Sequence, residues 1–99
     1  MSFDEFSGSI KRDTQPPAGT SAPLRALWHD ARGDWHGAHD CLQGEASREG
    51  DWVHAYLHRK EGDLGNAGYW YSRAGRPMLR RQDLASEWAE IARQLLAVS

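Results

Sequence analysis

A chain of 99 residues with a formal net charge of -2 is long enough to bury one hydrophobic core but too short for two domains. Because acidic and basic residues are interspersed, this charge disfavours general binding to nucleic acid or to a membrane surface. The single cysteine, Cys41, excludes a disulfide or a thiolate metal cluster within the chain and favours a reducing compartment.

Residues 1–21 are rich in Ser, Gly, Pro and Thr, a composition that predicts a flexible N-terminal tail. Phe3, Phe6 and Ile10 lie at helical spacing within this segment, so the alternative is a short helical turn that docks on a neighbouring surface. The segment lacks the apolar stretch of a signal peptide, and no later segment reaches the length of a transmembrane helix. We therefore expect a cytoplasmic protein that makes no membrane contact.

Residues 22–99 carry helical signals throughout and are expected to form a single helical-repeat domain. The first helix should end at Gly33, because glycine suits the left-handed position that follows a helix. The carboxylate of Asp34 is then placed to cap the next helix. The same junction returns at Gly62 and Asp63, so the chain should turn back sharply twice.

The similarity between the two junctions extends outward at a fixed separation of 29 positions. Five pairs of residues are identical: Ala26 and Ala55, His29 and His58, Gly33 and Gly62, Asp34 and Asp63, and Ala38 and Ala67. Five identities exceed what chance gives in so short a window, so we interpret them as two copies of a helix-turn-helix unit.

The second helix of each unit resembles that of the tetratricopeptide repeat, in which a Gly-Asp-aromatic turn precedes an alanine and then a large apolar residue. The matching positions are Gly33, Asp34, Trp35, Ala38 and Leu42 in one copy and Gly62, Asp63, Leu64, Ala67, Tyr71 and Ala74 in the other. The resemblance covers residues 22–77 and implies two stacked antiparallel hairpins that bind a protein or peptide. The stretch WVHAYLHRKEGDLGNAGYWYSRAGRP also resembles one in short uncharacterised bacterial proteins, and that resemblance implies no activity.

A last helix, capped by Asp83, should run to about Val98. One face of it carries the apolar residues Leu84, Trp88, Ile91 and Leu95. The opposite face is polar, as a helix that caps an array of repeats requires, and carries Glu87, Glu90, Arg93 and Gln94. The predicted fold is therefore all-α, with two stacked, tetratricopeptide-like antiparallel hairpins and a C-terminal capping helix.

Three aromatic residues, Tyr69, Trp70 and Tyr71, follow one another in the predicted fourth helix. Neighbouring helical residues point in different directions, so one packing stripe cannot bury all three. Tyr71 aligns with the inner seam of its hairpin. Tyr69 and Trp70 turn away from that seam, and Trp88 of the capping helix is the expected neighbour of one of them.

Aromatic and basic side chains together predict a binding surface made of Tyr69, Trp70, Arg73, Arg76, Trp28 and Trp52. Because the net charge is acidic, an acidic protein partner fits the arginines of this surface better than nucleic acid does. The predicted function is therefore non-catalytic binding of a protein or peptide. The alternative is a homodimer formed through the same aromatic side chains.

His54 and His58 lie four positions apart, so both imidazoles share one helix face, as binding of zinc or nickel requires. His36 and His39 form a second pair on the preceding helix. Neither pair has an evident third ligand, and the recurrence of His29 at His58 favours a packing position, so we predict no cofactor. A small metal-binding protein or metal-dependent enzyme that uses His54 and His58 is the alternative.

The remaining reactive side chains are accounted for by structural roles. Cys41 has no histidine on its own helix face and is expected to be a small core residue. The acidic residues at helix starts serve as caps, and these are Asp34, Asp51, Asp63 and Asp83. We therefore expect no enzymatic activity.

Overall fold

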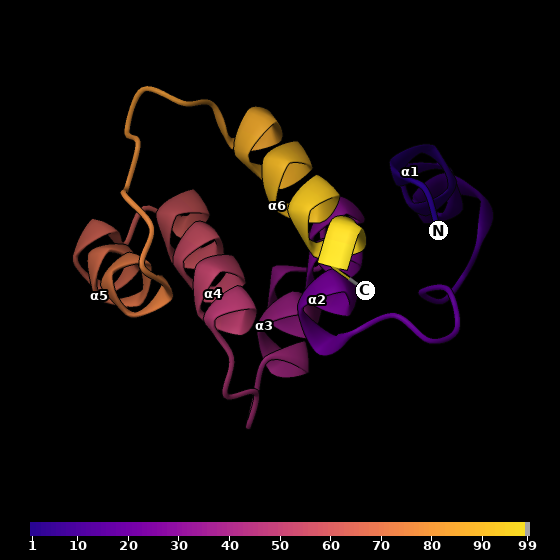
Figure 1. The fold of residues 1–99 in the computed structure, drawn as a ribbon, viewed down its shortest axis with the longest axis horizontal. Coiled ribbons are helices and arrows are strands. Elements are labelled where there is room, and N and C mark those ends of the chain that lie inside the picture. The colour runs from indigo at the N-terminus through magenta and orange to yellow at the C-terminus, as the bar shows by residue number, and fades with distance from the viewer. Residues whose placement is uncertain (99) are drawn as a thin grey trace.

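The computed structural model describes residues 1–98, which form six α-helices and no β-strand (Figure 1). In chain order the helices are α1 (Phe3–Arg12), α2 (Ala22–Ala31), α3 (Trp35–Cys41), α4 (Arg48–Glu61), α5 (Leu64–Ala74) and α6 (Leu84–Val98). None of these helices is long and apolar enough to cross a membrane. The predicted all-α fold is confirmed.

Each hairpin turns on a glycine and an aspartate, as the repeated junction predicts. Gly33 and Gly62 have φ angles of 83° and 90°, a left-handed conformation that glycine adopts without steric cost. The carboxylates of Asp34 and Asp63 each accept a hydrogen bond from a backbone N–H in the first turn of the following helix, at 2.9 and 3.2 Å. These caps satisfy N–H groups at the starts of α3 and α5, so the chain reverses within two residues.

The hairpins α2–α3 and α4–α5 stack, and α4 contacts both helices of the first hairpin. Alanines at equivalent positions of the two repeats have no exposed surface, namely Ala26, Ala38, Ala55 and Ala67. Their small side chains let the helix axes approach closely. The stack also brings α3 beside α4, and the candidate site forms at that contact.

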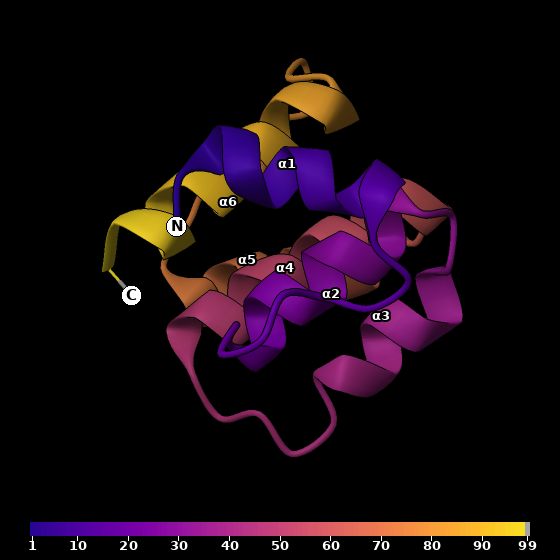
Figure 2. The same cartoon turned by 90° about the vertical axis from the view of Figure 1, so that its right-hand side faces the viewer.

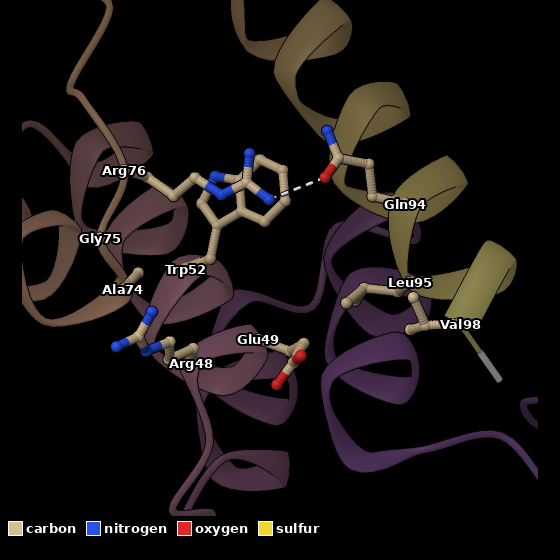
Figure 3. A pocket seen from close by; sticks show the side chains of 9 residues that line it. All are labelled: Arg48, Glu49, Trp52, Ala74, Gly75, Arg76, Gln94, Leu95 and Val98. Atoms are coloured by element: carbon tan, nitrogen blue, oxygen red, sulfur yellow. Dashed lines mark hydrogen bonds between the residues drawn. The ribbon is translucent and has the colours of Figure 1, made fainter.

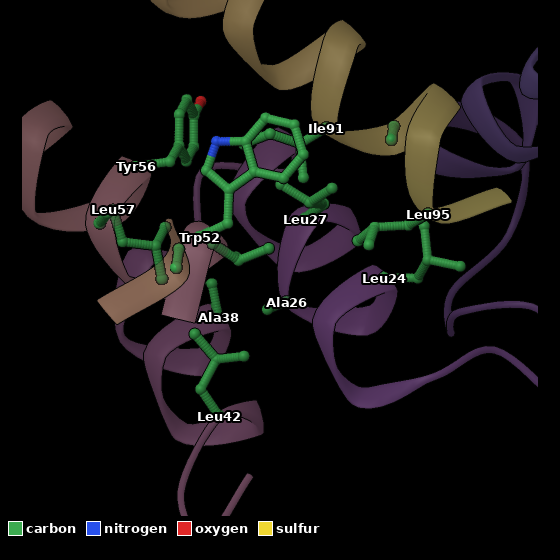
Figure 4. Packing of buried hydrophobic residues seen from close by; sticks show 14 of the residues in the cluster. Leu24, Ala26, Leu27, Ala38, Leu42, Trp52, Tyr56, Leu57, Ile91 and Leu95 are labelled. Atoms are coloured by element: carbon green, nitrogen blue, oxygen red, sulfur yellow. The ribbon is translucent and has the colours of Figure 1, made fainter. Parts of the chain in front are cut away.

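α6 packs across α2 and α4, the first helices of both hairpins (Figures 1 and 4). Its Ile91 and Leu95 join Leu27 of α2 and Trp52 of α4 in the hydrophobic core. The carboxylate of Asp83 caps α6, as predicted, by accepting a hydrogen bond at 2.7 Å from a backbone N–H of its first turn. In helical repeats the first helices line a binding groove, and here that face is covered by the chain itself.

Glu87 is buried, although the helical pattern placed it on the polar outer face of the last helix. Its carboxylate accepts a hydrogen bond from the hydroxyl of Tyr71 at 2.6 Å and pairs with the guanidinium of Arg59 at 2.8 Å. These contacts join α6 to both helices of the second hairpin. The helical pattern does not show that α4 supplies a cation and α5 a hydroxyl group at this position. It therefore predicted an exposed position for Glu87.

Residues 1–21 contain α1, which packs against α6 (Figure 2), so the alternative of a docked helical segment describes them better than a flexible tail. Phe6 is fully buried and stacks on Trp88 with ring centroids 6.0 Å apart. The hydroxyl oxygen of Ser9 accepts a hydrogen bond from the indole N–H of Trp28 at 3.0 Å. The composition argument failed because the partners of these few apolar side chains lie far along the sequence, in α2 and α6.

Candidate metal centre

Three histidines meet where α3 packs against α4. His39 comes from α3, while His54 and His58 occupy successive turns of α4. One ring nitrogen of each lies within 4.8 Å of those of the other two. The Nε2 atoms of His39 and His54 are 3.0 Å apart. Two imidazole nitrogens bound to a tetrahedral zinc ion are separated by about 3.3 Å, which is close to the separation of the His39 and His54 nitrogens.

Tryptophan rings orient two of the three imidazoles. Trp35 stacks on His39, with ring centroids 5.2 Å apart and planes 13° apart, and its indole N–H donates to the carbonyl oxygen of Leu57 at 2.8 Å. Trp70 of α5 stacks on His54, with centroids 4.1 Å apart and planes 7° apart. Stacking restricts rotation of each imidazole, so both rings are held near one orientation before any ligand binds.

A carboxylate orients the third imidazole. Nδ1 of the buried His58 lies 2.7 Å from Oε1 of Glu61. When Nδ1–H donates to this carboxylate, Nε2 keeps a free lone pair that is available to a metal. Metal-binding histidines are commonly held by carboxylates in this way. Glu61 and Asp63 also form a close group with His58, but both carboxylates are exposed.

Both ring nitrogens of His39 face a hydrogen-bond partner, so its tautomer is linked to the orientation of the Gln43 amide. Nε2 of the Gln43 amide is 3.3 Å from Nδ1 of His39, and Nε2 of His39 faces Nε2 of His54. If the amide N–H donates to Nδ1, the imidazole proton of His39 sits on Nε2 and is donated to His54. For Nε2 of His39 to bind a metal ion, the imidazole proton has to lie on Nδ1 instead. Turning the Gln43 amide over supplies a carbonyl oxygen that accepts it there.

The surroundings keep the imidazoles of His39 and His54 uncharged at neutral pH. Burial, followed by repulsion from His39 and His58, lowers the pKa of His54 to about 4. Burial, followed by repulsion from His58, also lowers the pKa of His39. A neutral imidazole is the form that ligates a metal, so no proton has to be lost to solvent at pH 7 before binding.

The three histidines line one pocket of about 430 Å³. The rest of its lining comprises Leu42, Gln43, Gly44, Glu45, Asn66 and Trp70. Within residues 1–98, no fourth histidine, cysteine or carboxylate joins the three-histidine group. A metal held by three imidazoles would therefore keep a coordination position open toward this pocket.

Two residues predicted for a binding surface, Trp28 and Trp52, belong to the core and are only 1% and 5% exposed. They are covered because α6 packs over the first helices of both hairpins, and Ser9 of α1 contacts Trp28 as well. Arg76 places its guanidinium 3.9 Å from the ring centroid of Trp52 and donates a hydrogen bond to Gln94 at 2.7 Å (Figure 3). These residues border a separate pocket of about 340 Å³ between α4, α5 and α6.

The three consecutive aromatics fall into three different environments. Tyr71 is buried, as predicted, and Trp70 is half-buried against His54. Tyr69 is 56% exposed, and its hydroxyl accepts a hydrogen bond from Arg73 at 3.2 Å. The expectation that Trp88 covers Tyr69 or Trp70 is wrong, because Trp88 packs against α1 instead.

Cys41 does not join the histidine group, and burial raises the pKa of its thiol, which disfavours a reactive thiolate. Sequence reasoning did identify His54 and His58 but missed His39 as their partner. The repeat contained the necessary signal, because stacked hairpins place the second helix of one unit beside the first helix of the next. Nothing in the sequence indicated that Trp35 and Glu61 would orient the histidines.

No family model matches this chain, and no curated protein or solved structure matches it either.

Proposed function

We propose that this protein binds a divalent transition metal ion, best Zn²⁺, through Nε2 of His39, His54 and His58. The observation that supports this most directly is the convergence of three imidazole nitrogens within 4.8 Å. Imidazole is a good ligand for zinc, copper and nickel, and zinc readily accepts three imidazoles with a fourth position left open. The stacked tryptophans and the carboxylate of Glu61 supply the outer support that such ligands need.

Metal binding would also link the two hairpins, because His39 lies in the first and the other two histidines in the second. An ion that binds the folded chain and not the unfolded one stabilises the fold. At a free zinc concentration of 100 times Kd, the free energy of unfolding should rise by about 2.7 kcal/mol. A rise in Tm on addition of zinc is therefore expected.

Isothermal titration calorimetry with protein purified without a histidine tag tests this proposal. One zinc ion per chain is expected, and His39→Asn and His54→Asn should each weaken binding by at least about tenfold. His29→Asn and His36→Asn are matched controls, because neither residue belongs to the three-histidine group. His29 is in addition the repeat counterpart of His58.

The proposal fails if His39→Asn binds zinc as tightly as the unaltered protein. It also fails if the two control variants lose as much affinity as the site variants. Circular dichroism of every variant separates loss of a ligand from loss of the fold.

A second proposal, binding of a protein or peptide, is favoured by the exposed aromatic and basic side chains of α5. Tyr69 and Arg73 contact each other on the outside of that helix, where an acidic partner could pair with the guanidinium. A pull-down from native extract that loses one defined partner with Tyr69→Ala would support it. Light scattering would show whether that partner is a second copy of the chain.

A further inference from the structure

The repeat defines a packing face on α5 that residues 1–98 leave open. The first hairpin contacts α4 through Trp35 of α3, whose indole N–H donates a hydrogen bond at 2.8 Å, and through His39, whose Nε2 lies 3.0 Å from that of His54. The residues 29 positions later are Leu64 and Gly68 of α5. Within residues 1–98 no further hairpin follows, and α6 packs across α2 and α4 (Figure 1). The face of α5 that corresponds to the contact of α3 with α4 therefore has no helix against it.

This open face of α5 carries exposed apolar side chains beside bare backbone. Leu64 and Tyr69 are 41% and 56% exposed. A Cβ atom added at Gly65 or at Gly68 would meet no atom of another element within 4 Å. Helices approach each other most closely where their side chains are small. A second helix can therefore pack on α5 and receive a large side chain such as that of Tyr69 against a glycine.

The N-terminal end of the open face is acidic. Glu61 and Asp63 are exposed, and no arginine or lysine among residues 1–98 pairs with either carboxylate. Glu61 contacts the imidazole of His58, and Asp63 accepts the capping hydrogen bond of α5. The nearest lysine in the sequence, Lys60, pairs with Asp30 at 2.8 Å. Negative charge is therefore available to a partner at this end.

The C-terminal end of the open face is basic. The guanidinium of Arg73 lies 3.5 Å from the carboxylate of Asp51, but 51% of the Arg73 side chain is exposed. The next arginine, Arg76, lies on the ring of Trp52. An acidic partner would pair with Arg73 and be repelled by Asp63 at the other end. A helix with the same charge pattern that runs antiparallel to α5 pairs favourably at both ends.

We propose that α5 packs antiparallel against α5 of a second copy of this chain, about a two-fold axis near Gly68. Because the symmetry repeats each contact, Arg73 of each copy pairs with Asp63 of the other, and Tyr69 of each lies on the glycines of the other. This inference names the partner of the α5 surface in the second proposal above and does not depend on metal binding. One helix of 11 residues makes a small interface, so the expected Kd is about 10–100 µM.

Sedimentation velocity of the full chain between about 5 and 500 µM tests the proposal, with a shift from monomer to dimer expected over this range. Gly68→Lys places a long charged side chain at the centre of the contact and should weaken the dimer at least about tenfold. Lysine favours a helix more than glycine and meets no other element here, so circular dichroism should show unchanged helicity. Gly8→Lys makes the same change on the exposed side of α1 and should leave the dimer intact.

Exchange of the two charges tests the antiparallel arrangement. Arg73→Glu and Asp63→Lys should each weaken self-association at least about tenfold, because like charges then face each other at both ends. An equimolar mixture of the two variants should regain the dimer, since the two new charges attract and the two unaltered residues still pair. Circular dichroism checks that Asp63→Lys, which removes a helix cap, remains folded.

A chain that stays monomeric at about 500 µM overturns the inference, as does a dimer that Gly68→Lys leaves unchanged. A mixture of folded Arg73→Glu and Asp63→Lys that associates no better than either variant alone overturns it as well. None of these results alters the proposed zinc binding, which calorimetry tests separately. Capture of a different protein through Tyr69 is likewise decided by the pull-down and not by sedimentation.

Discussion

The indole ring of Trp70 lies parallel to the imidazole ring of His54, with 4.1 Å between centroids and 7° between planes. The ring of His58 is parallel to that of His54 as well, with centroids 5.5 Å apart and planes 8° apart. Two residues of α4 are thus aligned with an aromatic side chain from α5. The orientation of a proposed metal ligand therefore depends on the neighbouring helix of its own hairpin.

Replacing Trp70 should weaken zinc binding without removing a ligand. Trp70→Ala frees the imidazole of His54 to rotate, and loss of an outer support of this kind typically costs about tenfold or more in metal affinity. Trp70→Phe keeps an aromatic face on the imidazole and should retain most of the affinity. Calorimetric titration with zinc measures both, and the adjacent exposed Tyr69→Ala should have no effect. Equal affinity of Trp70→Ala and the unaltered protein would show that the stack is not a support.

The stability of the metal-free protein should fall as the pH drops from about 6.5 to about 4. The folded state lowers the pKa of His54 from 6.5 to about 4, so over this range the unfolded chain binds more protons than the folded one. The full shift corresponds to about 3 kcal/mol, and solvent screening of this partly exposed ring reduces the expected loss to about 1–2 kcal/mol. Charges on His39, His58 and Arg73 act in the same direction, and Asp51 opposes them.

Urea unfolding at pH 7 and at pH 5 measures this loss. His54→Asn removes the titrating ring, so the variant should show a smaller decrease in unfolding free energy between the two pH values than the unaltered protein. The same decrease in both proteins would mean that other groups cause the acid sensitivity.

Glu61→Gln should weaken zinc binding by about tenfold, because it removes the charge that fixes the proton of His58 on Nδ1. The amide is the same size as the carboxylate, so the packing around His58 is preserved. Calorimetric titration gives the affinity. Glu49→Gln makes the same chemical change at the other end of α4, beside the other pocket, and should leave the affinity unaltered. Unaltered zinc affinity of Glu61→Gln would show that the carboxylate of Glu61 does not support the metal site.

Local patterns were sufficient to predict the hairpins. The left-handed glycines and capping aspartates act within a few residues, and the alanines that repeat after 29 positions mark the contacts between helices. From the sequence, docking of α1 was only the alternative to a flexible tail. That docking depends on Trp28 and Trp88, which lie far from α1 in the sequence and contact it only once the chain has folded.

The candidate site was predicted only in part, for the same physical reason. His54 and His58 share a helix face by spacing alone, and that pair was identified from the sequence. His39 reaches them through packing of α3 on α4, and its apparent partner in sequence, His36, is not in the group. Residue type alone did not show whether Trp52 belongs to the core or to a binding surface, and its burial places it in the core.

Variants of α1 should destabilise the protein, because this helix is part of the core. Phe6→Ala should lower the free energy of unfolding by about 3–5 kcal/mol, the usual cost of truncating a fully buried phenylalanine. Ser9→Ala should cost about 1–3 kcal/mol, since it leaves the buried indole N–H of Trp28 without an acceptor. Urea unfolding measures both, with the exposed Lys11→Ala as control. If Phe6→Ala and Lys11→Ala are equally stable, α1 contributes nothing to the core.

The free energy of unfolding should depend on whether the buried polar group of Arg59, Tyr71 and Glu87 is replaced in part or completely. Burial and the hydrogen bond to Glu87 raise the pKa of Tyr71, so its hydroxyl stays protonated and donates. Arg59→Met leaves the carboxylate without its cation and should cost about 3–5 kcal/mol. Adding Tyr71→Phe and Glu87→Leu removes the remaining buried polar groups, so the triple variant should be more stable than Arg59→Met alone in urea unfolding. A triple variant less stable than the single one would show that the polar contacts themselves stabilise the packing of α6.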